Sequence, residues 1–447
     1  MPISPARVAA FQILLRVERE NAYASELLHS SQCAELTIVD QGLTTELVMG
    51  VLRWRSRLDA TIAEVSSRAL SRLDIQVLTA LRMGAYQLGW LDRVPPRAAL
   101  HESVELVKRS RKHSAAPFAN AILRRLAETR GSTKQQKNIL SAADPDEVAN
   151  ASAHPSWLVH RWAAQFGLEL THQICAYNQK VPITTIRLRV PAEEELRDSG
   201  IKLEPGIFLA SARRVISGDV TKTRALAEGR IAIQDEASQL VAALLGKGSR
   251  ILDCCAAPGG KTWALADRNP AASIVAVELH PHRAELLSKR VKAKNVKVIA
   301  ADIRELPVTE LYDRVLVDAP CSGTGTIARN PEIKWRLTPD DLADLHNRQV
   351  AIVQATMNHV APGGRLIYST CSLEPEEDEN VVGAALRANP SFHVQDIYAH
   401  LETLIAGGEM VPGDLSSLIR GSYLRTVPGV HACDGFFVAA LERAQPG

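Results

Sequence analysis

Residues 250–262 read Arg250-Ile-Leu-Asp-Cys-Cys-Ala-Ala-Pro-Gly-Gly-Lys-Thr262, and they set the expected architecture of this chain. Their apolar start predicts a buried strand that ends at Asp253, followed by a tight Pro-Gly-Gly loop and a helix that opens near Lys261. Glycines let the backbone approach a ligand closely, and a helix that follows a parallel strand offers unpaired N–H groups at its start. We therefore expect this loop to hold a cofactor.

Two other interpretations of the loop remain open at this point. Its end, Gly260-Lys261-Thr262, matches the end of a phosphate-binding loop, G-x-x-x-x-G-K-[ST], which predicts a nucleoside triphosphatase. Position 255 is Cys where that pattern requires its first Gly, and the dinucleotide pattern G-x-G-x-x-G is absent. A glycine-rich turn between two core elements, without a ligand, is the third interpretation.

Strand and helix patterns alternate between residue 231 and the end of the chain. Strands are predicted to end at Asp253, Glu278, Asp302 and Asp318, with another at residues 365–369. Helices are predicted near residues 263–266, 282–294, 339–359 and 378–388. This alternation is typical of a doubly wound, mostly parallel, Rossmann-like α/β sheet, so we assign residues 231–447 to such a domain. The four acidic residues then lie at its ligand-facing edge.

The first part of the chain predicts an all-α domain at residues 1–140. Ser4-Pro5 supplies a helix cap and a proline at the first helical position. Amphipathic helices are predicted at residues 44–52, 58–65, 75–88, 100–108 and 118–126. A polar linker is expected at residues 131–150. Residues 151–230 then predict a small mixed α/β connecting domain, with helices at 157–166, 169–178 and 192–199 and a strand at 184–190.

Basic residues are concentrated in the helical domain. Residues 1–140 hold 20 Lys and Arg against 13 Asp and Glu, a balance of +7, whereas the remainder holds 32 against 37, a balance of −5. The asymmetry indicates an anionic partner such as RNA, although solvated helix faces give a similar excess. Arg53, Arg55 and Arg57 form one cluster expected to contact a phosphate backbone; Trp54 is expected either to stack on a base or to join the core.

Overall composition describes an ordinary globular protein of two or three domains, with 447 residues, of which 46% are hydrophobic and 23% charged. Met1 is not followed by a leader sequence, and no apolar run reaches transmembrane length, which predicts a cytoplasmic protein with no membrane partner. The seven cysteines include no C-x-x-C pair, so we expect free thiols, no disulfide framework and no metal site. We expect a monomer.

Reactive groups follow several of the predicted strands. Glu278 ends the second strand, where a carboxylate can grip the two hydroxyls of a ribose, and Asp302 is placed to accept a hydrogen bond from an adenine amino group. Cys321 and Cys371 each follow a strand on the same face. A thiolate among backbone N–H groups is a nucleophile, whereas a single cysteine is more often a small buried hydrophobic residue.

Taken together, these motifs resemble the NOL1/NOP2/Sun family of bacterial ribosomal RNA cytosine-C5 methyltransferases over nearly the whole chain. The matching stretches are Cys255-Ala-Ala-Pro-Gly-Gly-Lys261, Asp318-Ala-Pro-Cys-Ser-Gly323, Arg329-Asn-Pro-Glu-Ile-Lys-Trp335, Tyr368-Ser-Thr-Cys-Ser-Leu373 and Asp434-Gly-Phe-Phe437. The helical part resembles the NusB-type RNA-binding module through Glu46-Leu-Val-Met-Gly-Val-Leu-Arg-Trp54 and Phe118-Ala-Asn-Ala-Ile-Leu-Arg124. The departures, Glu278 for a commoner Asp, Cys254 and Pro191, are small.

The resemblance implies S-adenosylmethionine as cofactor and a cytosine of small-subunit, 16S ribosomal RNA as substrate, in naked or early-assembly RNA. It assigns attack on carbon 6 of the base to Cys371, breakdown of the adduct to Cys321, and a hydrogen bond near N3 to Asp318. The target base must be unstacked, which favours a loop or a single strand. The expected cofactor-binding residues are Cys255, Ala256, Ala257, Pro258, Gly259, Gly260, Lys261, Glu278, Asp302 and Asp318.

Two questions stay open after this resemblance. Lys261 contacts either the cofactor or the target phosphate. The non-enzymatic alternative is an RNA-binding assembly factor with an inactive methyltransferase fold, against which the intact cysteines and aspartates argue.

Overall fold

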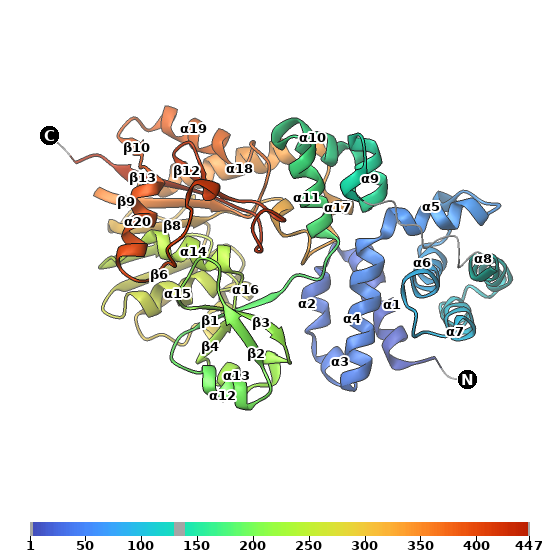
Figure 1. Cartoon of the computed structure of the whole chain (residues 1–447). Helices are drawn as coiled ribbons and strands as arrows, with labels where there is room; N and C mark the ends of the chain where they lie inside the picture. Colours follow the sequence, from blue (N-terminus) through green and yellow to red (C-terminus); the bar gives the residue numbers. More distant parts are fainter. Residues whose placement is uncertain (1–2, 129–138, 446–447) are drawn as a thin grey trace. The chain divides into compact units, whose positions relative to one another are not determined.

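The computed structural model describes residues 3–128 and 139–445, which form two compact units (Figure 1). One unit consists of Met1–Val181 together with Ile327–Arg336, and the other of Pro182–Thr326 together with Leu337–Gly447. The sequence places the helices of residues 157–178 with the small mixed segment, whereas the structure places them in the first, helical unit. The small sheet that follows them belongs to the second unit, so three predicted domains become two units.

Helices make up the described part of the first unit. They are α1 Pro5–Glu20, α2 Ala24–Leu28, α3 Ser31–Ala34, α4 Ile38–Arg53, α5 Arg55–Val65, α6 Ile75–Trp90, α7 Pro96–Arg109, α8 Ala116–Glu128, α9 Pro145–Ser152, α10 Ser156–Phe166, α11 Leu168–Asn178 and α17 Ile333–Arg336. Every helix predicted in this part of the chain is confirmed. Pro5 lies in the first turn of α1, where its missing N–H costs no hydrogen bond.

Close packing of α4 against α6 shows why a glycine stands inside α4. A Cβ atom on Gly50 would lie 2.0 Å from Cζ of Tyr86, so the Tyr86 ring occupies the space that a side chain would need. The Tyr86 hydroxyl donates a 2.5 Å hydrogen bond to Glu46 on the same face of α4. The apolar stripes of these helices thereby close into one core.

Part of the predicted linker, residues 131–150, is helical. Residues 131–138 of it lie outside the described residues, but Pro145–Ser152 form α9. The side chain of Asp144 accepts a 2.8 Å hydrogen bond from the N–H of Glu147, which caps the first turn. The linker prediction is therefore wrong for residues 145–150, because Asp-Pro-Asp-Glu is a helix start signal that we interpreted as a polar loop.

A nine-stranded sheet forms the centre of the second unit. Its parallel part has the order β9-β8-β5-β6-β7, formed by β5 Arg250–Asp253, β6 Ser273–Glu278, β7 Val296–Ala300, β8 Tyr312–Asp318 and β9 Val360–Thr370. Beyond β9 the sheet continues antiparallel through β10 Phe392–Val394, β11 Ile419–Arg420, β12 Tyr423–Thr426 and β13 Phe436–Arg443. The predicted strand ends at Asp253, Glu278 and Asp318 are confirmed, whereas β7 ends at Ala300, two residues before Asp302.

Alternate residues of the central strands face two different apolar cores, which explains their continuous hydrophobic runs. Leu316 and Ile367 lie in the core that includes residues of α14 Glu236–Leu245, α15 Gly260–Arg268 and α20 Ile397–Ala406. Val315 and Leu366 lie in the core that includes residues of α18 Pro339–Met357 and α19 Glu379–Ala388. The predicted doubly wound α/β fold is confirmed, with α16 Pro281–Arg290 between β6 and β7.

A second, smaller sheet belongs to the same unit. It has the antiparallel order β2-β3-β1-β4 and contains β1 Thr184–Leu188, β2 Lys202–Pro205, β3 Ala212–Ser217 and β4 Ile231–Ile233, with α12 Glu193–Asp198 and α13 Arg224–Ala227 beside it. Arg187 and Arg189 bind Asp267 of α15 at 2.7 and 2.6 Å. These ion pairs fasten the small sheet to the large one.

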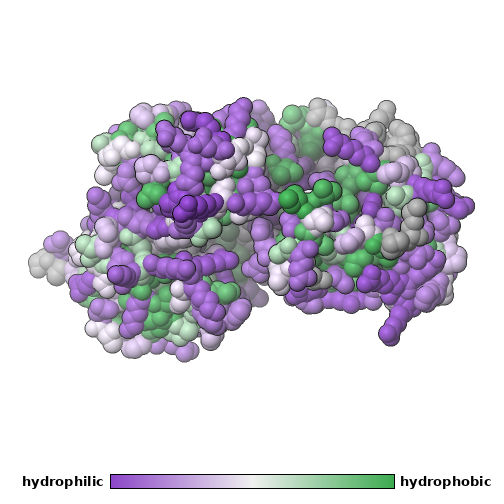
Figure 2. Space-filling view, turned by 90° about the horizontal axis from the view of Figure 1, so that it is seen from below, coloured by the Kyte–Doolittle hydropathy of each residue, from purple (hydrophilic) through white to green (hydrophobic). Residues whose placement is uncertain are grey.

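The surface carries mainly polar residues on the face that Figure 2 shows, where apolar residues gather in smaller groups. Within residues 3–128 and 139–445, no helix is both long and apolar enough to cross a membrane.

Candidate active site

The glycine loop lies between the end of β5 and the start of α15. The N–H of Ala256 donates to the carbonyl of Val277 at 3.0 Å, and the N–H of Gly259 to the carbonyl of Ala256 at 2.9 Å. Gly259 has a φ of 103°, a left-handed value that favours glycine, and a Cβ atom on it would meet Leu287 at 2.7 Å. The Pro-Gly-Gly pattern thus reflects a backbone shape that a larger residue would disturb.

Glu278 borders this loop from the end of β6. One carboxylate oxygen accepts a 3.3 Å hydrogen bond from the N–H of Ala257, and the other accepts a 3.1 Å bond from the N–H of His280. The side chain is 6% exposed, and the guanidinium of Arg283 lies 3.8 Å away. The structure therefore brings Glu278 together with residues 255–261.

The side chain of Asp302 forms its hydrogen bonds with Arg304 and not with Glu278 or the glycine loop. It follows β7 by two residues, and its carboxylate accepts hydrogen bonds from Arg304, including one of 2.5 Å from the guanidinium and one of 2.9 Å from the backbone N–H. These bonds hold the pKa of Asp302 below its usual value. The acid is ionised at neutral pH and paired with a neighbour in its own turn.

Asp253, at the end of β5, binds a residue of α15. Its side chain is buried, and one oxygen accepts a 2.7 Å hydrogen bond from the hydroxyl of Thr262 in the first turn of α15. Burial raises the pKa of Asp253 to about 7. Asp253 therefore connects β5 to α15.

Asp253→Asn should change how stability depends on pH. Folded Asp253 holds its proton more tightly than the unfolded chain does, so its stabilisation is complete below about pH 4 and is lost as the pH rises to about 7. Asparagine keeps an acceptor for Thr262 but cannot ionise. Relative to the parent, the variant should therefore gain up to about 4 kcal/mol between pH 4 and pH 8. Urea unfolding at both pH values measures this gain, and an equal difference at both would show that Asp253 does not titrate this way.

The two strand-end cysteines lie in contact. Sγ of Cys321, after β8, is 3.2 Å from Sγ of Cys371, after β9, and the N–H of Cys371 donates to Sγ of Cys321 at 3.3 Å. The hydrogen bond with Cys371 and burial both raise the pKa of Cys321 well above its ordinary value. Cys321 therefore retains its proton at neutral pH, beside a second thiol at the same sheet edge.

A lysine and an aspartate connect this thiol pair with the glycine loop. Nζ of Lys261 lies 2.7 Å from Oδ2 of Asp318, and Oδ1 of Asp318 accepts a 2.9 Å hydrogen bond from the hydroxyl of Ser369. The same ammonium lies 4.9 Å from the ring centroid of Phe436. The structure thus brings four of the five sequence motifs to one edge of the sheet.

Two glycines allow this convergence. The N–H of Gly325 donates to the carbonyl of Cys371 at 2.9 Å, and the N–H of Gly435 donates to the carbonyl of Gly325 at 2.8 Å. A Cβ atom on Gly325 would lie 2.2 Å from the Gly435 carbonyl oxygen, which no side chain tolerates. The loops after β8 and β9 and the start of β13 therefore touch through their backbones.

The fifth motif, residues 329–335, lies in the helical unit as part of Ile327–Arg336. Lys334 of this motif, and Arg336 directly after it, bind helix ends whose carbonyls lack partners within the helix. Nζ of Lys334 donates to the carbonyl of Arg53 at 2.9 Å, near the end of α4, and to the carbonyl of Ala153 at 2.8 Å, after α9. Arg336 donates to the carbonyl of Asn21 at 2.9 Å, after α1.

Other side chains of this segment bind further helix ends. Nε1 of Trp335 donates to the carbonyl of Leu52 at 2.6 Å, in the last turn of α4. The carboxylate of Glu332 accepts a 2.8 Å hydrogen bond from the N–H of Ala24, at the start of α2. Burial raises the pKa of Glu332 and lowers that of Lys334 well below its ordinary value. Ile327–Arg336, which we call the capping segment, thus completes ends of four helices.

Two of the three arginines of the predicted cluster are buried or paired, and Arg57 is partly exposed. Arg53 is 6% exposed and donates to the carbonyl of Ala328, and Arg55 forms a 2.9 Å ion pair with Glu18. Trp54 packs against Trp90 with ring centroids 5.6 Å apart. The expectation of a phosphate contact is therefore wrong for the buried Arg53, whereas Arg55 is partly exposed and already paired with an acid.

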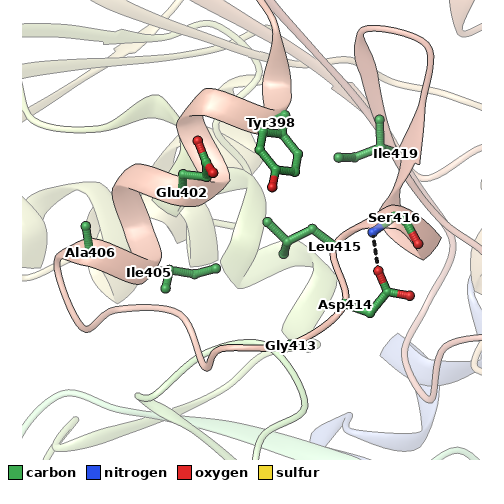
Figure 3. Close-up of a pocket in the computed structure, with 9 residues that line it drawn as sticks. All are labelled: Tyr398, Glu402, Ile405, Ala406, Gly413, Asp414, Leu415, Ser416 and Ile419. Atoms are coloured by element: carbon green, nitrogen blue, oxygen red, sulfur yellow. Dashed lines mark hydrogen bonds between the residues drawn. The ribbon is translucent and has the colours of Figure 1, made fainter.

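A large hollow lies elsewhere in the second unit. Figure 3 shows it between α20 and residues 413–419, with Tyr398 and Glu402 projecting from the helix; its volume is about 690 Å³. Its nine lining residues include none of the predicted site residues. Among the described residues, no group of three or more His, Cys, Asp and Glu side chains is arranged to hold a metal ion.

Similarities to known proteins extend over both units. Residues 242–442 match the family model for the 16S rRNA methyltransferase RsmB/F, and residues 4–128 match that of the NusB family. The chain is 31% identical to the Probable ribosomal RNA small subunit methyltransferase B of Bacillus subtilis, over 99% of this chain and 100% of the relative.

Solved structures show the same fold. The crystal structure of PH0851 is 25% identical, has a TM-score of 0.80, and covers 99% of this chain and 100% of that one. The crystal structure of NSun6 from Pyrococcus horikoshii with SFG is 20% identical, has a TM-score of 0.57, and covers 66% of this chain and 100% of that one.

Proposed function

This chain belongs to the 16S rRNA methyltransferase RsmB/F family, and we propose that it methylates carbon 5 of a cytosine through a covalent cysteine–cytosine adduct. Its substrate is ribosomal RNA of the small subunit, and its cofactor is S-adenosylmethionine, which supplies the methyl group when bound. The observation that carries the proposal is the pair of thiols, Cys321 and Cys371, with sulfur atoms 3.2 Å apart. We further propose that the protein acts as a cytoplasmic monomer on naked or early-assembly RNA.

The residues at the strand ends fit this cofactor. The loop of residues 255–261 leads directly into α15, whose first N–H groups lack partners within the helix and can bind a ligand. Glu278 borders the same loop and would hold the ribose hydroxyls, and Asp302 would hold the adenine amino group. The ammonium of Lys261 is already paired with the carboxylate of Asp318. Because we assign Asp318 to the target base, this pairing favours a position for Lys261 between the cofactor and the base.

Thiol chemistry solves the problem that carbon 5 of cytosine is a poor nucleophile. In the proposed reaction, the thiolate of Cys371 forms a bond to carbon 6, and the electron pair of the 5,6 double bond makes carbon 5 nucleophilic. Asp318 hydrogen-bonds the pyrimidine near N3 and favours this addition. The motif match gives the attack to Cys371, whose sulfur lies 3.2 Å from that of Cys321.

Release of the product needs the reverse of the addition. After carbon 5 has gained its methyl group, a base takes the proton from carbon 5, the electron pair of that C–H bond restores the 5,6 double bond, and the bond between carbon 6 and Cys371 breaks to release the thiolate. Cys321 assists this step, because its sulfur lies in contact with that of Cys371. Each round of methylation therefore ends with both cysteines free.

Bisulfite sequencing of 16S ribosomal RNA tests the proposed product. RNA from cells with the gene should contain one or more cytosines that resist bisulfite and that become sensitive when the gene is deleted. Restoring the gene with Cys371→Ala should leave those cytosines sensitive. An identical bisulfite pattern with and without the gene would contradict the proposal.

We propose that the helical unit binds RNA with the exposed arginines of its later helices. Arg109 and Arg111 are exposed at the end of α7, and Arg124 is exposed on α8. Removing the whole unit does not test this role, because residues 327–336 would lose the helix ends to which they bind. Substitutions of exposed side chains keep the unit intact.

The triple variant Arg109→Ala, Arg111→Ala and Arg124→Ala should bind RNA more weakly and with a shallower dependence on salt. Each phosphate contact with a single strand contributes about 0.7 to the slope of log affinity against log salt, so the slope should fall by about 2. Filter binding between 50 and 300 mM salt measures it. Arg16→Ala, at an exposed arginine paired with Glu20, is the matched control, and an unchanged slope in the triple variant would exclude these contacts.

A further inference from the structure

Behind the two thiols lies a carboxylate that the sequence did not single out. Glu377 is fully buried, and it receives hydrogen bonds from both cysteine-bearing loops. One oxygen accepts from the N–H of Ser322 at 2.8 Å, and the other accepts from the hydroxyls of Ser322 and Ser372, the latter at 2.5 Å. Ser322 follows Cys321 directly and Ser372 follows Cys371, so one side chain holds the neighbours of both thiols.

We propose that Glu377 is a positioning residue that sets the spacing of the two thiols for the reaction proposed above. The two loops leave different strands, β8 and β9, and the short sulfur–sulfur distance requires them to keep a fixed relation. Besides their shared bonds to Glu377, the hydroxyls of Ser322 and Ser372 lie 3.1 Å apart. The carboxylate joins the two loops within one residue of each thiol.

Glu377 is itself held from several sides. The hydroxyl of Tyr368, on β9, donates a 2.5 Å hydrogen bond to the carbonyl of Glu377. Nε2 of Gln349, on α18, donates to the carboxylate of Glu377 and to the carbonyl of Pro320, both at 2.9 Å. Because α18 and β9 are core elements, the carboxylate is a fixed point to which the loops are attached.

A second anchor lies one residue further along. Asp378 accepts a 2.6 Å hydrogen bond from the hydroxyl of Thr370, the residue before Cys371, and a 2.9 Å bond from the guanidinium of Arg425. Asp378 is fully buried, so this contact also draws the end of β9 toward the segment that carries Glu377. The position of Cys371 is thus restrained by contacts on either side of it.

The hydrogen-bonding capacity of each side chain predicts how severely substitutions of Glu377 affect the two loops. Four donors meet the two oxygens of Glu377, and an ionised carboxylate, which donates nothing, can accept from all four. Glutamine keeps the shape and one acceptor oxygen, and the serine hydroxyls can rotate to accept from its NH₂ group. Alanine removes all four contacts of the side chain but keeps the backbone carbonyl that accepts from Tyr368. We expect Glu377→Gln to lie between the parent and Glu377→Ala in each measurement below.

Two measurements on the full chain test the role. Oxidation by diamide, which joins two neighbouring thiols as a disulfide, reports the spacing of Cys321 and Cys371 without any RNA. Its rate, read by mass spectrometry of the linked peptides, should fall at least about tenfold in Glu377→Ala, because the loss of several hydrogen bonds frees the loops. The rate of methyl transfer at saturating substrates should fall about 100-fold, the cost of misplacing reacting groups by about 1 Å.

Matched variants separate positioning from general damage. Glu402→Gln changes an exposed acid of α20 that lines the hollow away from the thiols, and it should leave both rates unchanged. Affinity for S-adenosylmethionine should stay unchanged in Glu377→Ala, as measured by calorimetry. If that variant does not fold, Ser372→Ala, which removes one link, should still slow disulfide formation measurably.

The outcomes distinguish this role from the proposed function. Disulfide formation as fast in Glu377→Ala and Ser372→Ala as in the parent would overturn the positioning role. Slower disulfide formation with undiminished methyl transfer would support the positioning of the thiols and contradict the cysteine mechanism instead.

Discussion

Cys371→Ala should abolish methyl transfer to 16S ribosomal RNA and leave no covalent protein–RNA species, whereas Cys321→Ala should accumulate one. Without Cys371 no bond to carbon 6 forms, so carbon 5 stays unreactive. Without Cys321 the addition and the methylation still occur, but the release step slows, so the adduct persists. The loss in the first variant should be at least about 10⁴-fold, since removal of a nucleophile costs that much or more.

A denaturing gel reads this difference directly. Labelled RNA should migrate as a slow band with Cys321→Ala and S-adenosylmethionine, and without such a band with Cys371→Ala. Cys433→Ala, at a buried cysteine, is the matched control and should behave like the parent. A slow band with Cys371→Ala and none with Cys321→Ala would reverse the two roles.

Lys334→Ala should destabilise the helical unit by about 3–5 kcal/mol. The lysine is 1% exposed, and its Nζ donates to carbonyls near the ends of two helices, α4 and α9. Alanine leaves both carbonyls without this donor and opens a cavity in a packed region, and each effect alone costs one to several kcal/mol. The helical unit should therefore unfold at a lower denaturant concentration than in the parent.

Hydrogen exchange measured by mass spectrometry follows this effect element by element. Peptides from α4 and α9 should lose protection in Lys334→Ala. Lys289→Ala, at an exposed lysine paired with Glu285, should leave protection unchanged. Equal protection of α4 and α9 in the parent and in Lys334→Ala would show that the capping segment does not support the helical unit.

Elements with a recognisable pattern in their own residues could be predicted from the sequence. Continuous apolar runs that end in an acid located β5, β6 and β8 to the correct final residue, because buried parallel strands have both faces covered. The third strand stopped at Ala300 because Asp302 belongs to the turn with Arg304. A strand-end acid is therefore a weaker signal when a basic residue follows it closely.

Contacts between distant residues could not be predicted in this way. Nothing near Lys334 in the sequence indicates that its partners are the carbonyls of Arg53 and Ala153, 281 and 181 positions away. Burial of the Arg53 side chain likewise depends on a distant residue, Ala328, to whose carbonyl it donates. The run Arg53-Trp54-Arg55 predicts a basic surface. Only the structure shows that the capping segment packs against it.

The positioning residue was missed for a related reason. Glu377 stands in the acidic run Glu374-Pro-Glu-Glu-Asp-Glu379, which is typical of a solvated helix start. Its burial accompanies contacts with α18 and with Tyr368 of β9, and the packing of these elements against the loops is a tertiary property. By contrast, Cys321, Cys371, Asp318 and Lys261 stand in motifs that follow predicted strands, so their meeting at one sheet edge was predictable.

Release of hydrogen from carbon 5 distinguishes methylation of that carbon from methylation of any other atom of the base. Methylation of that carbon must expel its proton, so 16S ribosomal RNA transcribed with [5-³H]cytidine should lose tritium to water as it gains methyl groups. We expect one tritium to be released for each methyl group transferred by the parent protein, and none with Cys371→Ala. Methyl transfer to this RNA without tritium release would show that the methyl group goes to another atom and would contradict the account.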